Sequence, residues 1–329
     1  MRETRNMTMI QAIQDGLYTA LAEDDGVLVF GEDVGQNGGV FRATDGLQDA
    51  FGPRRVFDAP LSESGIVGTA VGMAAAGLKP VVEIQFMGFI YPAFEQIVSH
   101  AARVRTRTRG RHPAPLVIRA PYGGGIRAPE LHSDSSEAFF VHQPGLKVVA
   151  PSGPYDAKGL LLAAIDDPDP VVFLEPIRLY RAFKEEVPLG HYSVPIGKAK
   201  VVREGGDLAM FVWGGMVPWA MEAAEKAARQ DGIETRVVDL RTLFPLDVAT
   251  IVESVEHTGR AIIVHEAPRT AGVGAEVATL IQERAFYSLE APVVRVAGFD
   301  VPFPLFSLED LYLPGVARIL SGIRRAVAA

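Results

Sequence analysis

The chain has 329 residues, of which 48% are hydrophobic, and this is enough to build two domains with cores of ordinary size. Its 32 basic and 40 acidic residues give a net charge of −8, which argues against a nucleic-acid-binding surface. The sequence contains no cysteine, so disulfides, thiolate metal sites, iron–sulfur clusters and a cysteine nucleophile are excluded.

The sequence shows neither a charged-then-apolar leader nor an apolar run long enough to span a membrane. We therefore expect a cytoplasmic protein without a membrane partner. Thr8 followed by Gln11 predicts a helix N-terminus with a capping box. The next apolar residues recur at helical spacing, at Ile10, Ile13, Leu17 and Leu21. The first element is therefore predicted to be an amphipathic helix.

Apolar, β-branched runs then alternate with helical stretches. The runs lie at residues 27–30, 55–58, 81–84, 116–119, 147–150 and 171–174, and the helical stretches at 63–76, 92–109 and 155–165. Continuous apolar strands that alternate with helices indicate a mostly parallel sheet covered on both faces.

Residues 181–200 interrupt this pattern with prolines, glycines and a charged Lys-Glu-Glu, which is typical of a linker. A second alternating unit follows, with strands at 208–213, 235–240, 261–265 and 293–296 and helices at 217–230, 248–255, 275–285 and 316–327. The prediction is an α/β protein of two domains, residues 1–185 and 201–329, joined by a linker at 186–200.

Four polar residues follow predicted strands of the first unit: Glu32, Glu63, Gln85 and His132. In open parallel sheets, ligands bind outside the carboxyl ends of the strands. Each residue also has a structural explanation. Glu32 could be a solvated loop acid, and Glu63 a favourable charge at a helix start after Ser62. Gln85 could satisfy nearby backbone groups, and His132 could be an ordinary loop histidine. Their shared location favours a functional site.

Two glycine-containing segments leave alternatives open. The helical stretch 68–77 is almost free of large side chains, which fits close packing within the chain or a subunit interface. Gly272-Val-Gly-Ala-Glu276 lies between a predicted strand and a helix, as in a dinucleotide loop, but Val277 stands where the third glycine of that motif belongs. The sequence has no HExxH, Walker lysine or GxSxG motif, so a hydrolase is unsupported.

Nearly the whole chain, from Met7 onward, resembles the β subunit of the thiamine-diphosphate-dependent 2-oxo acid dehydrogenase component, in the transketolase-like superfamily. The matching stretches are Gly31-Glu-Asp-Val, Leu61-Ser-Glu, Gly68-Thr-Ala-Val-Gly-Met, Glu83-Ile-Gln-Phe, Leu131-His-Ser, Pro154-Tyr-Asp-Ala-Lys-Gly-Leu, Pro170-Val-Val-Phe-Leu-Glu, Asp239-Leu-Arg-Thr and Ala291-Pro-Val-Val-Arg-Val. The resemblance implies a pyrimidine-binding transketolase-like domain and a transketolase C-terminal-like domain.

The same resemblance implies that two α and two β chains assemble, with each thiamine diphosphate between an α and a β chain. In the family, a Gly-Asp-Gly…Asn segment of α holds the diphosphate and Mg²⁺, and this sequence has no such segment. A lipoyl acyltransferase core is the implied further partner. The chain is thus expected to supply one half of an active site.

By matching motif, Glu63 would hydrogen-bond the pyrimidine N1′ and favour the 4′-imino tautomer that removes the thiazolium proton. Glu32, Leu61, Gln85 and Phe89 match cofactor-contacting positions. His132 matches a histidine that transfers protons during substrate reaction and acyl transfer, and Phe89, Ile90, Tyr91 and Pro92 match the substrate pocket. The family's potassium site maps onto main-chain oxygens near Leu116, Ala164, Asp167 and Asp169.

The stretches at 83–89 and 129–134 look more like those of bacterial pyruvate dehydrogenase β subunits, a resemblance that favours pyruvate, while 178–181 and 298–300 suit branched-chain relatives equally well. A single methylene in a pocket changes specificity by only about 1–3 kcal/mol, so both substrates stay open. Two remote alternatives are a nicotinamide-dependent dehydrogenase, suggested by 272–276, and a non-catalytic assembly protein, suggested by the missing half-site and by 68–77.

Overall fold

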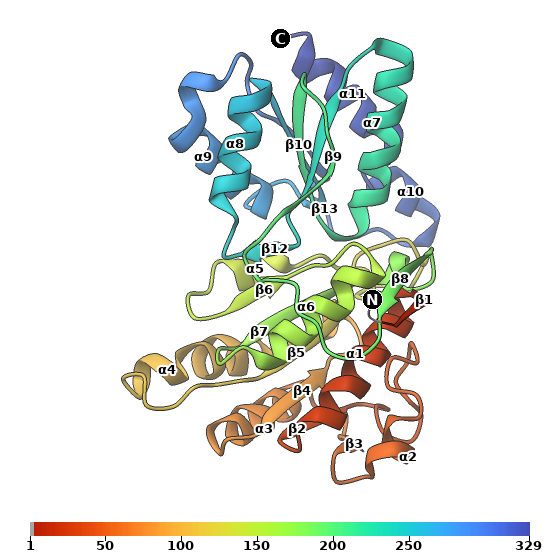
Figure 1. The fold of residues 1–329 in the computed structure, drawn as a ribbon, viewed down its shortest axis with the longest axis vertical. Helices are drawn as coiled ribbons and strands as arrows, with labels where there is room; N and C mark the ends of the chain where they lie inside the picture. Colours follow the sequence, from red (N-terminus) through yellow and green to blue (C-terminus); the bar gives the residue numbers. More distant parts are fainter. Residues whose placement is uncertain (1–2) are drawn as a thin grey trace.

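The computed structural model describes residues 3–329 and contains two α/β units stacked along the long axis of the molecule (Figure 1). The sheet of the first unit has the order β12-β6-β7-β5-β4-β2-β3. Its strands are β2 (Val27–Gly31), β3 (Val56–Asp58), β4 (Lys79–Glu83), β5 (Val117–Tyr122), β6 (Lys147–Val149), β7 (Val171–Pro176) and β12 (Thr242–Phe244). All neighbours are parallel except β12, which runs antiparallel to β6.

Helices cover both faces of this sheet, as predicted. On one face α1 (Met9–Glu23) packs on α6 (Pro154–Asp166), and on the other α3 (Glu63–Ala75) packs on β4. The capping box predicted at Thr8 and Gln11 is present at the start of α1.

The helix predicted at 92–109 is not regular. It consists of the 3₁₀ turn η2 (Tyr91–Ala93), the π-helical turn η3 (Gln96–His100), the 3₁₀ turn η4 (Ala101–Arg103) and the short helix α4 (Val104–Arg107). Changes of hydrogen-bond pitch of this kind are common near functional sites. Here they accompany burial of Ala93, Ile97 and Ala102 in the core.

The sheet of the second unit has the order β14-β13-β10-β11-β9, with only β9 antiparallel to its neighbour. Its strands are β9 (Lys200–Arg203), β10 (Leu208–Val212), β11 (Thr235–Asp239), β13 (Ala261–Pro268) and β14 (Val294–Gly298). The helices α7 (Val217–Asp231) and α11 (Val316–Val327) pack together on one face, and α8 (Val248–Thr258) and α9 (Val273–Ala285) on the other (Figure 1). Both units confirm the predicted fold class.

The segment predicted as a linker contains a strand that the sequence pattern did not indicate. β8 (Lys184–Pro188) pairs antiparallel with β1 (Thr4–Thr8) and forms a two-stranded sheet beside α6. β12 comes from the second half of the chain but extends the sheet of the first unit. The boundaries at 185 and 200 stay a prediction, but β12 shows that the two units interlock.

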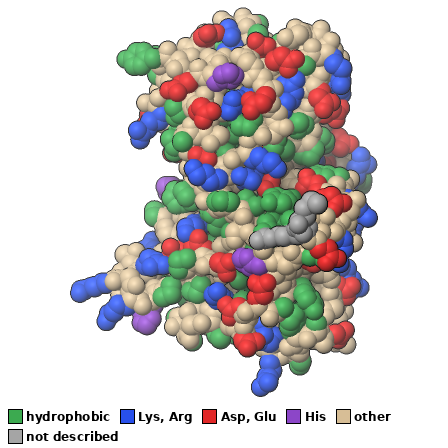
Figure 2. All heavy atoms as spheres, viewed as in Figure 1, with side chains coloured by type: hydrophobic (Ala, Val, Ile, Leu, Met, Phe, Trp, Pro, Cys, Tyr) green, Lys and Arg blue, Asp and Glu red, His purple; other side chains and the backbone are tan. Residues whose placement is uncertain are grey.

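Hydrophobic residues of the described part of the chain form three buried clusters, and the largest extends from the first sheet into the second unit. The other two lie under α1 and α6 and under α7 and α11. Figure 2 shows acidic and basic side chains interspersed over one face of the molecule. Within residues 3–329, no helix has the length and apolar character needed to cross a membrane.

Candidate active site

Glu32 and Glu63 lie at the carboxyl ends of neighbouring parallel strands. Glu32 directly follows β2, and Glu63 is the first residue of α3, where Ser62 accepts a hydrogen bond from the Gly65 amide at 3.3 Å. Burial raises the pKa of Glu32, and the charge of Glu63 raises it further. The Glu32 Oε1 atom is buried and has no hydrogen-bond partner among the described residues. A buried oxygen without a partner is costly, so this geometry fits a polar ligand.

Gln85 lies at the same edge of the sheet and contacts Asp33, the residue after Glu32. Its Nε2 atom donates to Asp33 Oδ2 at 3.4 Å. Asp33 has a φ of 56°, a left-handed conformation that is uncommon outside glycine. The turn after Asp33 is fastened to the end of β3, because Asp58 accepts a hydrogen bond from the Gly35 amide at 2.7 Å. The strand ends that carry Glu32, Glu63 and Gln85 are thus held together.

A buried ionic network connects the neighbouring strands of the same sheet. Arg119 donates to Glu83 at 2.8 Å and, in a bidentate pair, to Glu175 at 2.6 and 3.0 Å, while Tyr180 donates to Glu175. These side chains are almost fully buried and connect β4, β5 and β7. Burial raises the pKa of Glu83, and the facing Arg119 charge opposes that rise. Glu83 lies two residues before Gln85, so the network fixes the strand from which Gln85 projects.

His132 packs against two phenylalanines, one of which, Phe86, directly follows Gln85. The centroid of its ring lies 4.4 Å from that of Phe86 and 4.9 Å from that of Phe89. Its Nδ1 atom is 2.8 Å from the Glu130 carbonyl oxygen. A carbonyl only accepts hydrogen bonds, so Nδ1 carries the proton, and the neutral ring presents Nε2 as a base. The structure therefore holds His132 in the tautomer that proton transfer through Nε2 requires.

The loop that carries His132 is clamped from the second unit. Glu309, at the start of α10 (Glu309–Tyr312), accepts hydrogen bonds from the amides of Gly125 at 2.6 Å and Arg127 at 3.2 Å. Glu266 in β13 accepts one from the Gly124 amide at 3.2 Å. Both carboxylates are buried, at 1% and 5% exposure. The loop closes on itself where the Gly123 amide donates to the Asp134 carbonyl at 3.1 Å.

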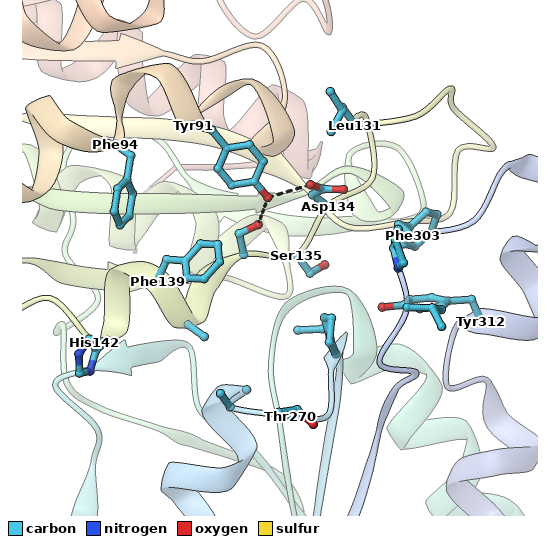
Figure 3. Close-up of a pocket in the computed structure, with 18 of the residues that line it drawn as sticks. Tyr91, Phe94, Leu131, Asp134, Ser135, Phe139, His142, Thr270, Phe303 and Tyr312 are labelled. Atoms are coloured by element: carbon cyan, nitrogen blue, oxygen red, sulfur yellow. Dashed lines mark hydrogen bonds between the residues drawn. The ribbon is translucent and has the colours of Figure 1, made fainter.

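A cavity of about 850 Å³ lies beside the His132 loop, between the two units (Figure 3). Tyr91 donates to Asp134 at 2.8 Å and lies 2.7 Å from the Ser136 hydroxyl, while Phe303 and Tyr312 form the facing wall. Burial and the Asp134 carboxylate raise the pKa of Tyr91 to about 12. Tyr91 is therefore a neutral hydroxyl near physiological pH.

The remaining predicted ligand-contacting residues differ in exposure. The side chain of Leu61 is 80% exposed and Pro92 is exposed, whereas Tyr91 is 39% exposed, with its hydroxyl held by Asp134 and Ser136. Phe89 is partly buried against His132 and Phe86, whereas Ile90 is fully buried in the core. Ile90 thus anchors the backbone of its neighbours in the core and does not face the cavity side of this segment.

Sequence reasoning missed Glu266, Glu309, Asp134 and Ser136. Glu266 and Glu309 lie more than a hundred residues from the loop they hold, and no local pattern marks them as its partners. Asp134 and Ser136 lie close to His132 in the sequence, so a search of polar residues around Leu131-His-Ser would have found them.

The four residues predicted for potassium lie around the end of α6 and the start of β5. The Leu116 and Ala164 carbonyls accept backbone hydrogen bonds from Val171 at 3.0 Å and Asp167 at 3.3 Å. Lys147 donates to both carboxylate oxygens of Asp167 at 2.7 and 2.6 Å, and Arg105 pairs with Asp169. These contacts give the acidic side chains protein partners, and the main-chain potassium site stays a prediction.

The glycines at 272 and 274 serve packing. A Cβ atom on Gly272 would approach the Pro268 carbonyl and the ring of His265, and one on Gly274 would lie 2.6 Å from His265 Nε2. The small residues therefore let α9 approach β13 closely. This contact accounts for the motif without a dinucleotide.

Two family models cover most of the chain. Residues 5–182 match the transketolase pyrimidine-binding domain, and residues 197–319 match the transketolase C-terminal domain. A split-gene transketolase, described as an inactive β4 tetramer, has a similar structure, with a TM-score of 0.77 and 23% identity over 98% of this chain and 99% of the other. That likeness confirms the fold.

Curated relatives are similar over nearly their full length. The pyruvate dehydrogenase E1 component subunit beta of Staphylococcus epidermidis is 54% identical over 95% of this chain and 96% of its own. The protein of the same name in Bacillus subtilis is 54% identical over 98% of both chains. That of Staphylococcus aureus is 54% identical over 94% of both chains.

Proposed function

The chain belongs to the family of pyruvate dehydrogenase E1 β subunits, with two transketolase-like domains, and on this premise we propose that it acts with an α subunit to decarboxylate pyruvate. The acyl group then passes to a lipoyl-bearing acyltransferase. The observation that carries the proposal is the juxtaposed pair Glu32 and Glu63, with the partnerless Glu32 Oε1, in a chain without a diphosphate motif.

The half-site fits the pyrimidine end of thiamine diphosphate. The half-site combines two carboxylates and the Gln85 amide with two apolar groups, the exposed Leu61 side chain and the Phe89 ring. A polar heterocycle would satisfy the orphaned oxygen and rest against the apolar side chains. We assign these five residues to that end of the cofactor, and the diphosphate and Mg²⁺ to the α subunit.

Glu63 is the acid–base residue of this proposal. Its place at the first position of α3, beside Glu32, puts its carboxyl group at the edge of the sheet where the pyrimidine would lie. A carboxyl group so placed can exchange a proton with a ring nitrogen. The bound cofactor supplies the electron sink for loss of CO₂.

The His132 loop handles the substrate side. With its Nδ1 proton directed to the Glu130 carbonyl, His132 offers Nε2 to accept or return a proton. Phe86 and Phe89 restrict water around the ring, which strengthens electrostatic interactions there. Phe89, Tyr91 and Pro92 contribute to the 2-oxo acid pocket, and the buried Ile90 fixes their backbone.

The proposal has four further parts: an assembly of two α and two β chains, an acyltransferase core as partner, a main-chain potassium ion near Asp167 and a cytoplasmic location.

The potassium ion is tested by replacing potassium with sodium in the buffer of the assembled enzyme. A lower melting temperature of the assembled enzyme in sodium supports the site, and equal temperatures contradict it.

The substrate is tested by co-expression with the α partner and comparison of pyruvate with 3-methyl-2-oxobutanoate in thiamine-diphosphate-dependent reduction of an artificial electron acceptor. We expect higher kcat/KM for pyruvate. Preference for 3-methyl-2-oxobutanoate would reassign the complex to branched-chain substrates, and inactivity with both in a correctly assembled complex would refute the catalytic role.

A further inference from the structure

Four arginines line a cavity in the second unit that shares no lining residue with the cavity beside the His132 loop. They are Arg269 after β13, Arg295 in β14, and Arg318 and Arg325 in α11, and the cavity has a volume of about 320 Å³. This concentration of positive charge is unexpected in a chain with a net charge of −8. A concave surface focuses the field of charges that share one sign.

Neutral carbonyl groups fix three of these guanidinium groups without neutralising them. Arg269 donates to the carbonyl of Arg295 at 3.2 Å, and Arg295 donates to the carbonyl of Arg269 at 3.1 Å. Arg318 donates to the carbonyls of Tyr312 at 2.8 Å and Ala297 at 2.5 Å. The contacts orient the side chains but leave their charges in place.

One carboxylate, that of Asp300, offsets part of this charge without forming a salt bridge. Across residues 3–329, none of the four arginines has an acidic side chain within 4.0 Å, the limit for a salt bridge. Asp300 is the one acid that lines the cavity, and its two oxygens accept hydrogen bonds from the Thr270 amide at 2.8 Å and hydroxyl at 2.7 Å. Burial and the charge of Arg269 lower the pKa of Arg295, and the charge of Asp300 opposes part of that decrease.

We propose that this four-arginine pocket binds a compact free polyanion that carries at least two phosphate or carboxylate groups. Guanidinium groups bind such oxyanions through paired hydrogen bonds, and several converging forks select for multiple negative charges. The guanidinium carbon of Arg318 stacks 4.3 Å from the centroid of Phe299, so this charge is held in place while its terminal nitrogens donate to carbonyl groups.

The test uses inorganic pyrophosphate as the probe and the full-length chain as the protein, titrated by calorimetry at constant ionic strength. We expect one saturable site, weakened about tenfold or more by Arg325→Gln. Arg325 has no hydrogen bond or ion pair among the described residues, so this change spares the fold. Arg269→Gln is a second variant that should weaken the same site.

Arg324→Gln is the matched control because it removes the same charge from the neighbouring position. Arg324 points to Asp231, at 2.8 Å, and does not line the cavity. Absence of saturable binding, or equal loss in the Arg324 and Arg325 variants, would overturn the proposal. The titration is repeated with the assembled αβ complex. Retained binding supports a free polyanion, whereas loss on assembly would assign the pocket to acidic side chains of the partner chain and overturn it.

Discussion

Gly88 packs directly against the backbone of Leu131, so closely that a Cβ atom on Gly88 would overlap the Leu131 carbonyl oxygen. Gly88 belongs to the turn η1 (Met87–Phe89), and Leu131 precedes His132 with a φ of 67°. A residue other than glycine or asparagine in the left-handed region requires support from its surroundings. The contact therefore couples the turn that carries Phe89 to the conformation of the His132 loop.

Gly88→Ala is expected to lower kcat of the assembled enzyme by about a hundredfold, because a displacement of about 1 Å at a catalytic group costs that much. The added methyl group forces Leu131 and His132 away from Phe89. The measurement is steady-state kinetics, with circular dichroism to verify the fold. Gly206→Ala is the control, since a Cβ atom there meets open space. Unchanged kcat in Gly88→Ala would show that the loop tolerates displacement.

Glu63→Gln tests the acid–base role that we propose for Glu63. An amide cannot exchange a proton with the ring nitrogen, so turnover with pyruvate should fall by about 10²–10⁴-fold while the α and β chains still assemble. Glu276→Gln also removes a carboxylate from the first turn of a helix, in α9, and should retain activity. Substantial turnover by the Glu63 variant, measured as CO₂ release, would contradict the assignment.

Glu309 tests the clamp on the His132 loop. Glu309→Ala removes both carboxylate oxygens that bind the Gly125 and Arg127 amides, whereas Glu309→Gln keeps one acceptor. We expect kcat to decrease in the order wild type, Gln, Ala, with a smaller effect on KM for pyruvate. Asp310→Asn is the control, because the exposed Asp310 pairs with the Arg127 side chain and not with the loop amides. A change in melting temperature without a change in kcat would indicate a purely structural role.

The regular strands and helices were predictable because buried parallel strands read as continuous apolar runs and surface helices repeat at 3.6 residues. The runs around Val29 and Val172 are of this kind. β8 and β12 escaped prediction because they are short strands whose pairing partners are distant in sequence. The helix at 92–109 was predicted as continuous because its periodicity cannot reveal a change to π-helical pitch at Gln96.

The candidate site also has a part that was predictable from the sequence and a part that was not. Motifs located Glu32, Glu63, Gln85 and His132, and strand order brings the first three to one edge of a sheet. The clamp from Glu309 and the fit of Gly88 against Leu131 depend on tertiary contacts. A sequence carries no local signal for such contacts, since any buried acid or small residue satisfies the same pattern.

Glu137 provides a test of pH-dependent stability. This carboxyl group is fully buried at the start of α5 (Glu137–Val141), where Oε1 accepts a hydrogen bond from Trp213 at 3.3 Å and Oε2 has no partner among the described residues. Burial raises its pKa from 4.5 to about 7. The folded chain then binds more protons than the unfolded chain between these values, so the free energy of unfolding falls as pH rises from about 4.5 to about 7. The loss amounts to roughly 3 kcal/mol.

The variant Glu137→Gln cannot ionise. It should be more stable than the wild type at pH 8, with little difference or a small loss at pH 5, as measured by denaturant unfolding. Part of the slope should persist, because burial also raises the pKa of Asp239 to about 7. Glu283→Gln, at an exposed position, should match the wild type at both pH values. An equal difference between Glu137→Gln and the wild type at both pH values would show that Glu137 does not titrate in this range.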